Sequence, residues 1–263
     1  MATRDRRPPK KVRNRRLNTS FAVPAESDDV AVVPVRWVKF VVGIFLLPFC
    51  YVLTASFFSA LTHATEKKVW FTPEFWFFGL GAVLWLIIYH GLPRPLRLYV
   101  FGHELTHAVV VLLMGGKVSK FRVGRDGGHI VSSKINTWIA LAPYFIPIYS
   151  VIVIGLYGGG SIFYNLEPYR AVLYLLVGLT WAFHATFTLS MIPRGQTDLA
   201  YGGAFFSLVV IYLMNLLVLS LLLIVATPYV SFPSFARELT GHGAAFAAEA
   251  TALIKALLRA AGI

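Results

Sequence analysis

The residues best suited to chemistry in this sequence are His103, Glu104 and His107, which read His-Glu-Leu-Thr-His inside an apolar stretch from Leu96 to Met114. Side chains four residues apart lie on one face of a helix, so the two imidazoles would point at the same position. Histidine is a zinc ligand, and a glutamate beside the first ligand is placed to take a proton from a metal-bound water. The pattern therefore predicts half of a hydrolytic zinc site, with Glu104 as general base.

Chance is a weak explanation for this pattern. Random shuffling of a chain with this content of histidine and glutamate produces an HExxH sequence about once in 200 chains. The residues on both sides of the motif are compatible with lipid, and ionisable groups at membrane depth are costly enough to indicate function. We therefore expect His103 and His107 to bind a metal ion.

The composition is that of an integral membrane protein. Hydrophobic residues make up 57% of the 263 residues and charged residues only 14%, which excludes an ordinary soluble domain. Apolar stretches of a length that can cross about 30 Å of hydrocarbon occur at residues 36–62, 70–92, 96–114, 136–157, 169–192 and 204–227. We predict an all-α polytopic membrane protein with about six transmembrane helices.

Four regions follow one another along the chain. Residues 1–34 begin with a dense run of arginine and lysine without apolar periodicity, which predicts a disordered tail. Residues 35–95 should form a transmembrane helical hairpin, residues 96–230 the core around the HExxH helix, and residues 231–263 an amphipathic helix along the membrane surface. A basic tail before a transmembrane segment orients it, so we expect a cytoplasmic amino terminus in a bacterial inner membrane, with the lipid bilayer rather than nucleic acid as partner.

Residues 115–135 differ from the sequence around them, because glycine and basic residues replace the apolar run. Residues 118–123 and 129–133 alternate or favour strand, and residues 125–128 carry a turn signal. This pattern predicts a small membrane-associated β-hairpin after the HExxH helix, with an ordinary basic loop as the alternative. A hairpin with a free edge could pair with an extended peptide substrate as an added strand.

A catalytic zinc site has a third protein ligand besides the two histidines. Asp198 is the best candidate, because it follows a break between two apolar stretches at Pro193 and Gly195. Irregular backbone at membrane depth is tolerated only where protein buries it or where it lines a cavity. His184 is an alternative, although a lone histidine in a helix bundle is more often part of the structure, and Glu167 is another, in a turn-like context.

The HExxH stretch, followed by an Ile-Pro turn and an aspartate that heads the next helix, resembles the site-2 protease family of intramembrane zinc metalloproteases. In that family the carboxylate ligand follows an Asn-x-x-Pro-x-x-x-Leu-Asp-Gly type of motif, and the spacing from Pro193 to Asp198 matches it. The sequence departs from the motif at Ser190, Thr197 and Leu199, where the family has Asn, Leu and Gly.

The resemblance implies one Zn2+ per chain, held by His103, His107 and Asp198, with Glu104 activating the water. It also implies hydrolysis of peptide bonds in or near transmembrane segments of a membrane protein substrate, within a metalloprotease core at residues 96–230. The alternatives are a catalytically silent metal-binding membrane protein and a different membrane HExxH protease class that uses a downstream glutamate. A transporter is disfavoured because the sequence has no internal repeat.

The predicted segments conflict with the expected topology. If every apolar stretch crosses once from a cytoplasmic amino terminus, the basic segment 115–135 falls outside, against the positive-inside rule. Asp198 then falls on the opposite side from His103. We therefore expect that either the HExxH helix or the proline-broken stretch 136–157 does not cross the membrane simply.

Overall fold

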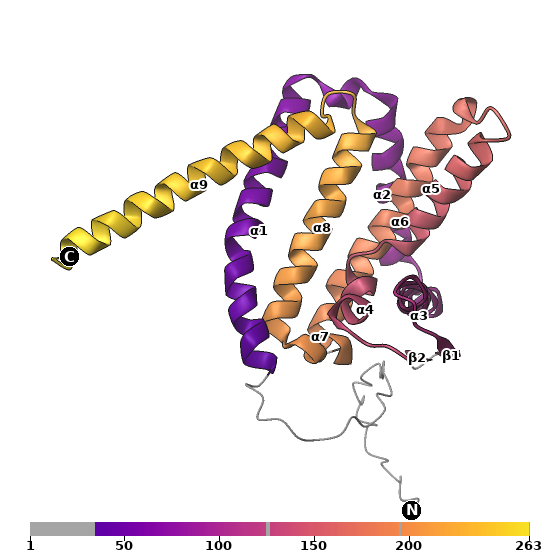
Figure 1. Cartoon of the computed structure of the whole chain (residues 1–263). Helices are drawn as coiled ribbons and strands as arrows, with labels where there is room; N and C mark the ends of the chain where they lie inside the picture. Colours follow the sequence, from indigo (N-terminus) through magenta and orange to yellow (C-terminus); the bar gives the residue numbers. More distant parts are fainter. Residues whose placement is uncertain (1–34, 125–126, 195, 263) are drawn as a thin grey trace, which may run out of the picture.

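The computed structural model describes residues 35–124, 127–194 and 196–262, and the predicted tail at residues 1–34 lies outside them. The described chain is almost entirely helical (Figure 1). Its α-helices are α1 (Val35–Glu66), α2 (Pro73–Gly91), α3 (Leu96–Leu113), α4 (Thr137–Leu141), α5 (Ile148–Ser161), α6 (Arg170–Met191), α7 (Thr197–Gly202), α8 (Ala204–Ala226) and α9 (Phe232–Ala260). Short 3-10 helices are η1 (Val69–Phe71), η2 (Ala142–Tyr144), η3 (Glu167–Tyr169) and η4 (Ile192–Arg194), and the two strands are β1 (Val118–Gly124) and β2 (Gly127–Ser132).

By length and composition, five of the described helices could cross a membrane, or six if one bent pair counts as a span. These helices are compatible with a multi-pass membrane protein, in agreement with the predicted all-α polytopic fold. The bent pair is the proline-broken stretch, in which Thr137–Tyr144 and Ile148–Ser161 meet at 82°. Pro143 and Pro147 account for the bend, because proline removes a backbone donor and clashes with the preceding helical turn.

Close backbone contact joins α2 to α6 along the bundle. A Cβ atom built on Gly81 would clash with the carbonyl oxygen of Leu175, and one built on Gly178 would clash with that of Phe78. Small residues let membrane helices approach until their backbones touch, and van der Waals packing then stabilises the pair. The two glycines therefore fix the crossing point of α2 and α6.

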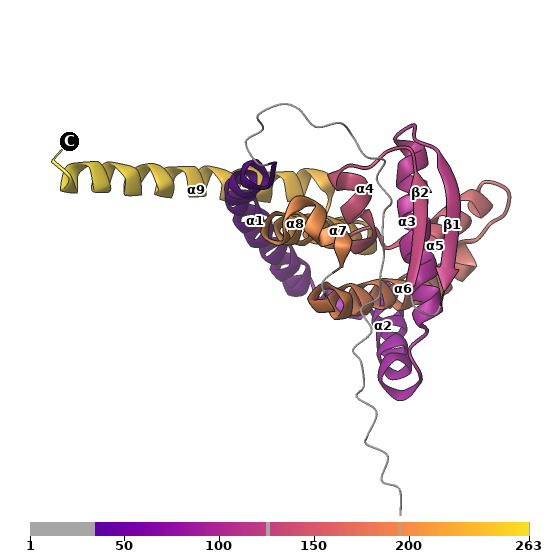
Figure 2. The same cartoon turned by 90° about the horizontal axis from the view of Figure 1, so that it is seen from below.

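Helix α3 lies across the bundle instead of along it. Figure 1 shows α3 end-on while α1 and α8 run lengthwise, and Figure 2 shows α3 along its length while α8 is seen end-on. Half of its 18-residue window is buried inside the protein, against 17–39% for the other candidate spans. The hairpin and the α4–η2 segment cover one side of α3, and they account for this larger buried share.

The predicted β-hairpin is present as an antiparallel pair of strands after α3. Phe121 pairs with Ile130 across the strands, and both side chains point at α3. The Phe121 ring lies 5.9 Å from that of Phe101, and Ile130 belongs to a buried cluster with Val110 and Val111. The hairpin is thus attached to the helix that carries the HExxH residues.

Helix α9 leaves the opposite end of the bundle from the start of α1 and extends away from it (Figure 1). A capping box between Ser231 and Ser234 begins the helix. Near its start Phe235 is buried, and further along the Phe246 ring lies 5.6 Å from that of Tyr51 in α1. Its position on a membrane surface stays a prediction.

Candidate metal centre

Helix α3 presents His103, Glu104 and His107 to the interior of the protein. The exposed fractions of these residues are 4%, 2% and 1%. The Nε2 atoms of the two histidines lie 3.2 Å apart, as the four-residue spacing predicts. Two imidazoles and a carboxylate are therefore gathered in a place that excludes bulk water.

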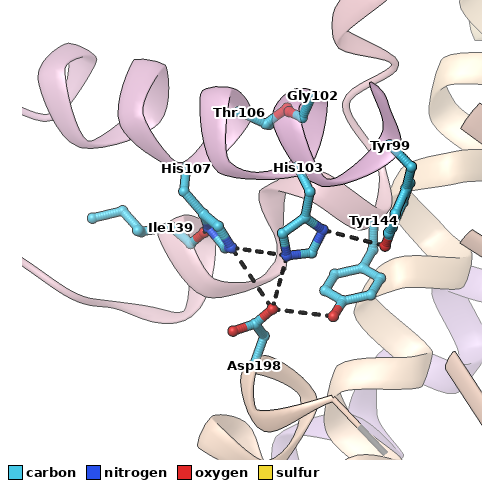
Figure 3. A network of polar contacts seen from close by, with 8 residues as sticks. All are labelled: Tyr99, Gly102, His103, Thr106, His107, Ile139, Tyr144 and Asp198. Carbon is cyan, nitrogen blue, oxygen red and sulfur yellow. Dashed lines mark hydrogen bonds and ion pairs between the residues drawn. The ribbon is translucent and has the colours of Figure 1, made fainter. Parts of the chain in front are cut away.

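Asp198 completes the group from the other side (Figure 3). It lies in the first turn of α7, after the break that Pro193 makes in the helical path, and is 1% exposed. Its Oδ2 atom is 3.1 Å from Nε2 of His103 and 3.6 Å from Nε2 of His107. Within the described part of the chain, this trio forms a group whose ligand atoms all lie within 4.8 Å of one another and could hold a metal ion.

The spacing of these three atoms suits zinc. Tetrahedral ligands at about 2.0–2.1 Å from zinc lie about 3.3–3.4 Å from one another. The observed separations of 3.1, 3.2 and 3.6 Å bracket that value. Two nitrogens and one oxygen also form a donor set that catalytic zinc uses.

Neighbouring groups orient both imidazoles with Nε2 toward the centre. Nδ1 of His107 lies 2.7 Å from the carbonyl oxygen of Ile139, which can only accept, so this nitrogen donates and leaves the Nε2 lone pair for a metal. Nδ1 of His103 lies 3.3 Å from the hydroxyl of Tyr99. Metal-binding histidines are held in this manner through their second ring nitrogen.

Tyr144 of η2 holds the carboxylate. Its hydroxyl donates a 3.1 Å hydrogen bond to Oδ2 of Asp198, and its ring lies edge-on to that of His103 with centroids 5.4 Å apart. Tyr144 is fully buried, so water does not compete for this bond. The other oxygen, Oδ1 of Asp198, is buried without a hydrogen-bond partner among the described residues, which is costly for a carboxylate unless a cation or an ordered water satisfies it.

Glu104 stands beside the centre but is not one of the grouped ligand atoms. Its Oε1 atom is buried and has no hydrogen-bond partner among the described residues. Strand β2 passes directly over it at Gly128. A buried carboxylate next to a metal ligand, with one oxygen uncommitted, is suited to accept a proton from water.

The two alternative ligands stand apart from the trio. His184 of α6 helps to line a hollow of about 20 Å³ beside His103, but it is not part of the grouped ligand set. Glu167 is exposed and pairs with Arg170 at 2.9 Å, at the end of α5 and α6 distant from α3 (Figure 1). Of the three candidates that the sequence offers, Asp198 is the one placed beside His103 and His107.

Sequence reasoning did not find Tyr144, Tyr99 or Gly128. Tyr144 belongs to an apolar stretch in which one tyrosine carries no periodic signal, and its partner Asp198 is 54 residues away. A signal for Tyr99 did exist: it precedes His103 by one helical turn, and the i, i+4 rule places both side chains on the same face of the helix.

Comparisons with known proteins add no relative. No family model matches the chain, and neither the curated proteins nor the solved structures contain a match to it.

Proposed function

We propose that this chain is an intramembrane zinc metalloprotease of the site-2 protease type. The observation that carries the proposal is the convergence of His103, His107 and Asp198, drawn from elements about 90 residues apart, with Glu104 beside them. Near and inside membrane helices such groups are costly, so their gathering in one buried place favours a functional site over coincidence. The proposed substrates are membrane proteins, cut in or near a transmembrane segment.

Each residue has a role in the proposed hydrolysis. Zinc, when bound, supplies a Lewis acid and a water acidified toward neutrality. Glu104 takes the proton of the attacking water and returns it to the leaving amine. Tyr144 keeps Oδ2 of Asp198 turned toward the centre, and the carbonyl of Ile139 keeps His107 in the tautomer that can bind.

The substrate has to be extended at the bond that is cut, because a helical peptide bond is hydrogen-bonded to its own chain and sterically enclosed. The two-stranded sheet supports this step, since each strand pairs with a partner on one side only and offers backbone groups on the other. An unwound substrate segment would add to this sheet as a further strand.

The charges support a cytoplasmic site. In Figure 1 the beginning of α1, the α2–α3 connection, the hairpin and α7 lie at one end of the bundle. Among the described residues of these elements, the exposed and half-buried charges are all basic: Arg36, Lys39, Arg94, Arg97, Lys117, Lys120, Arg122, Lys134 and Arg194. The opposite end mixes both signs. Under the positive-inside rule the basic end faces the cytoplasm.

The arrangement of the helices supports a topology without the conflict that the sequence predicts. Helix α2 returns the chain to the end of the bundle where α1 began. Because α3 then lies across the bundle, the hairpin that follows it stays at that end. Helices α5 and α6 then run away from that end and back to it, which brings Asp198 to His103 (Figures 1 and 2). We propose that the zinc, the hairpin and the amino terminus share the cytoplasmic side.

The experiment that tests the function compares wild type with Glu104→Gln, both purified with zinc bound, on a reconstituted protein that has one transmembrane helix. The proposal requires cleavage by wild type and at least a hundredfold loss in the variant, since general acid–base catalysis contributes about 10²–10⁴-fold. Bound zinc without cleavage that depends on Glu104 would identify a catalytically silent metal-binding protein instead.

A further inference from the structure

Strand β2 comes close to the side chain of Glu104 at Gly128. A Cβ atom built on Gly128 would lie 2.6 Å from Cγ and 2.9 Å from Oε1 of Glu104, and 2.8 Å from the carbonyl oxygen of Arg122 on the paired strand. Real Cβ atoms do not come this close to other atoms. The strand and the glutamate are therefore in contact because residue 128 has no side chain.

The backbone conformation does not explain the glycine. Gly127 has a φ of 131°, in the region that favours glycine, whereas Gly128 is not among the positive-φ residues. Gly128 sits within the regular register of the hairpin, opposite Val123. A Cβ atom there would meet Glu104 on α3 and the carbonyl of Arg122 on the paired strand, so these two neighbours, and not a positive φ, exclude a side chain.

The alternation of side chains along β2 shows which face of the strand lies against α3. Gly128 and Ile130 are buried on the side that faces α3, while His129 between them is half-buried and points to the other side of the sheet. Ile130 anchors the strand in the core with Val110 and Val111. The strand is thus fixed over α3, and Gly128 forms the part of it that closes over the glutamate.

We propose that Gly128 is a positioning residue for Glu104. Strand β2 is the wall against which the carboxylate is held beside His103, so that the orientation of the base depends on the hairpin. A side chain at residue 128 displaces either the carboxylate or the strand. The inference rests on the proposed function for the role of Glu104, while the contact itself can be tested without any activity.

The activity test is Gly128→Ala, with His129→Ala as the matched control on the same strand. Displacement of a catalytic group by about 1 Å costs on the order of a hundredfold in rate. We expect Gly128→Ala to keep one zinc per chain and an unchanged KM while kcat falls at least tenfold, and His129→Ala to keep its kcat within about threefold. A kcat of Gly128→Ala equal to that of wild type, or loss of its zinc, would overturn the proposal.

A cross-linking test covers the case in which Gly128→Ala fails to fold. The Cβ atoms of residues 104 and 128 lie no more than about 4 Å apart, given the 2.6 Å contact and one carbon–carbon bond, which suits a disulfide. In a Cys50→Ala chain, Glu104→Cys with Gly128→Cys should form a disulfide under mild oxidation in membranes, and Glu104→Cys with His129→Cys should not.

The two proposals fail in different ways. If the 104–128 pair forms no disulfide although both cysteines are present as reactive thiols, the contact between Gly128 and Glu104 is refuted. This result does not depend on whether the protein has protease activity. If wild type cleaves no substrate but the cross-link forms, the contact stands, and the protease function and the positioning role both fall.

Discussion

The hydrogen bond from Tyr144 to Asp198 offers a graded test of the metal centre. Tyr144→Phe removes the hydroxyl that donates to Oδ2 at 3.1 Å and keeps the ring that packs edge-on against His103. Both residues are buried, so bulk water does not reach the position of the lost donor. A hydrogen bond to a charged group contributes about 1.5–3 kcal/mol, and residues that orient metal ligands contribute about 10- to 100-fold to metal affinity.

We therefore expect Tyr144→Phe to raise the zinc Kd about 10- to 100-fold, which corresponds to about 1.4–2.7 kcal/mol. The assay is competition against a chromophoric chelator of known affinity, with purified proteins at one pH. The control is Tyr149→Phe, which removes a hydroxyl bonded to the carbonyl oxygen of Leu98 at 2.6 Å and should leave the Kd within about twofold. An unchanged Kd in Tyr144→Phe, or an equal loss in Tyr149→Phe, would refute the assignment of Tyr144 as the residue that holds Asp198.

Three further predictions concern the surroundings of the site. Gly178→Val should lower the free energy of unfolding, measured by denaturation, by about 1–3 kcal/mol or more, because a side chain there meets the α2 backbone. The control Gly155→Val has open space around it and should change the free energy of unfolding little in the same assay. His184→Ala should keep one zinc per chain by elemental analysis, and a loss of zinc would make His184 a ligand. In a Cys50→Ala chain, cysteines at the exposed positions Lys120 and Thr197 should react with an impermeant thiol reagent from the cytoplasmic side, and strictly external labelling of both would contradict a cytoplasmic cleft.

Local patterns in the sequence predicted most of the site. The i, i+4 spacing of His103 and His107 holds in any straight helix, and the alternation in residues 118–133 indicated the hairpin because strand periodicity is local. The five-residue spacing from Pro193 to Asp198 pointed to the third ligand through the family resemblance, and the structure places Asp198 beside both histidines.

The sequence predicted only that either α3 or the stretch 136–157 does not cross the membrane simply, and it did not decide between them. An apolar helix of 18 residues has the same composition whether lipid or protein covers it. Tertiary packing distinguishes the two cases: half of the 18-residue window of α3 is buried, and the hairpin and the α4–η2 segment pack against this helix. The roles of Tyr144 and Gly128 were hidden for the same reason, because each depends on a contact between distant elements.

The most direct test of the central claim is the metal content of the purified protein and its variants. We predict one zinc per chain in wild type and in Glu104→Gln, and less than about one tenth of that in His103→Ala, His107→Ala and Asp198→Ala. Folding of each variant is checked by its helical circular dichroism. Wild type without zinc after reconstitution, or full zinc retention in a folded Asp198→Ala, would contradict the metal centre on which the proposed function rests.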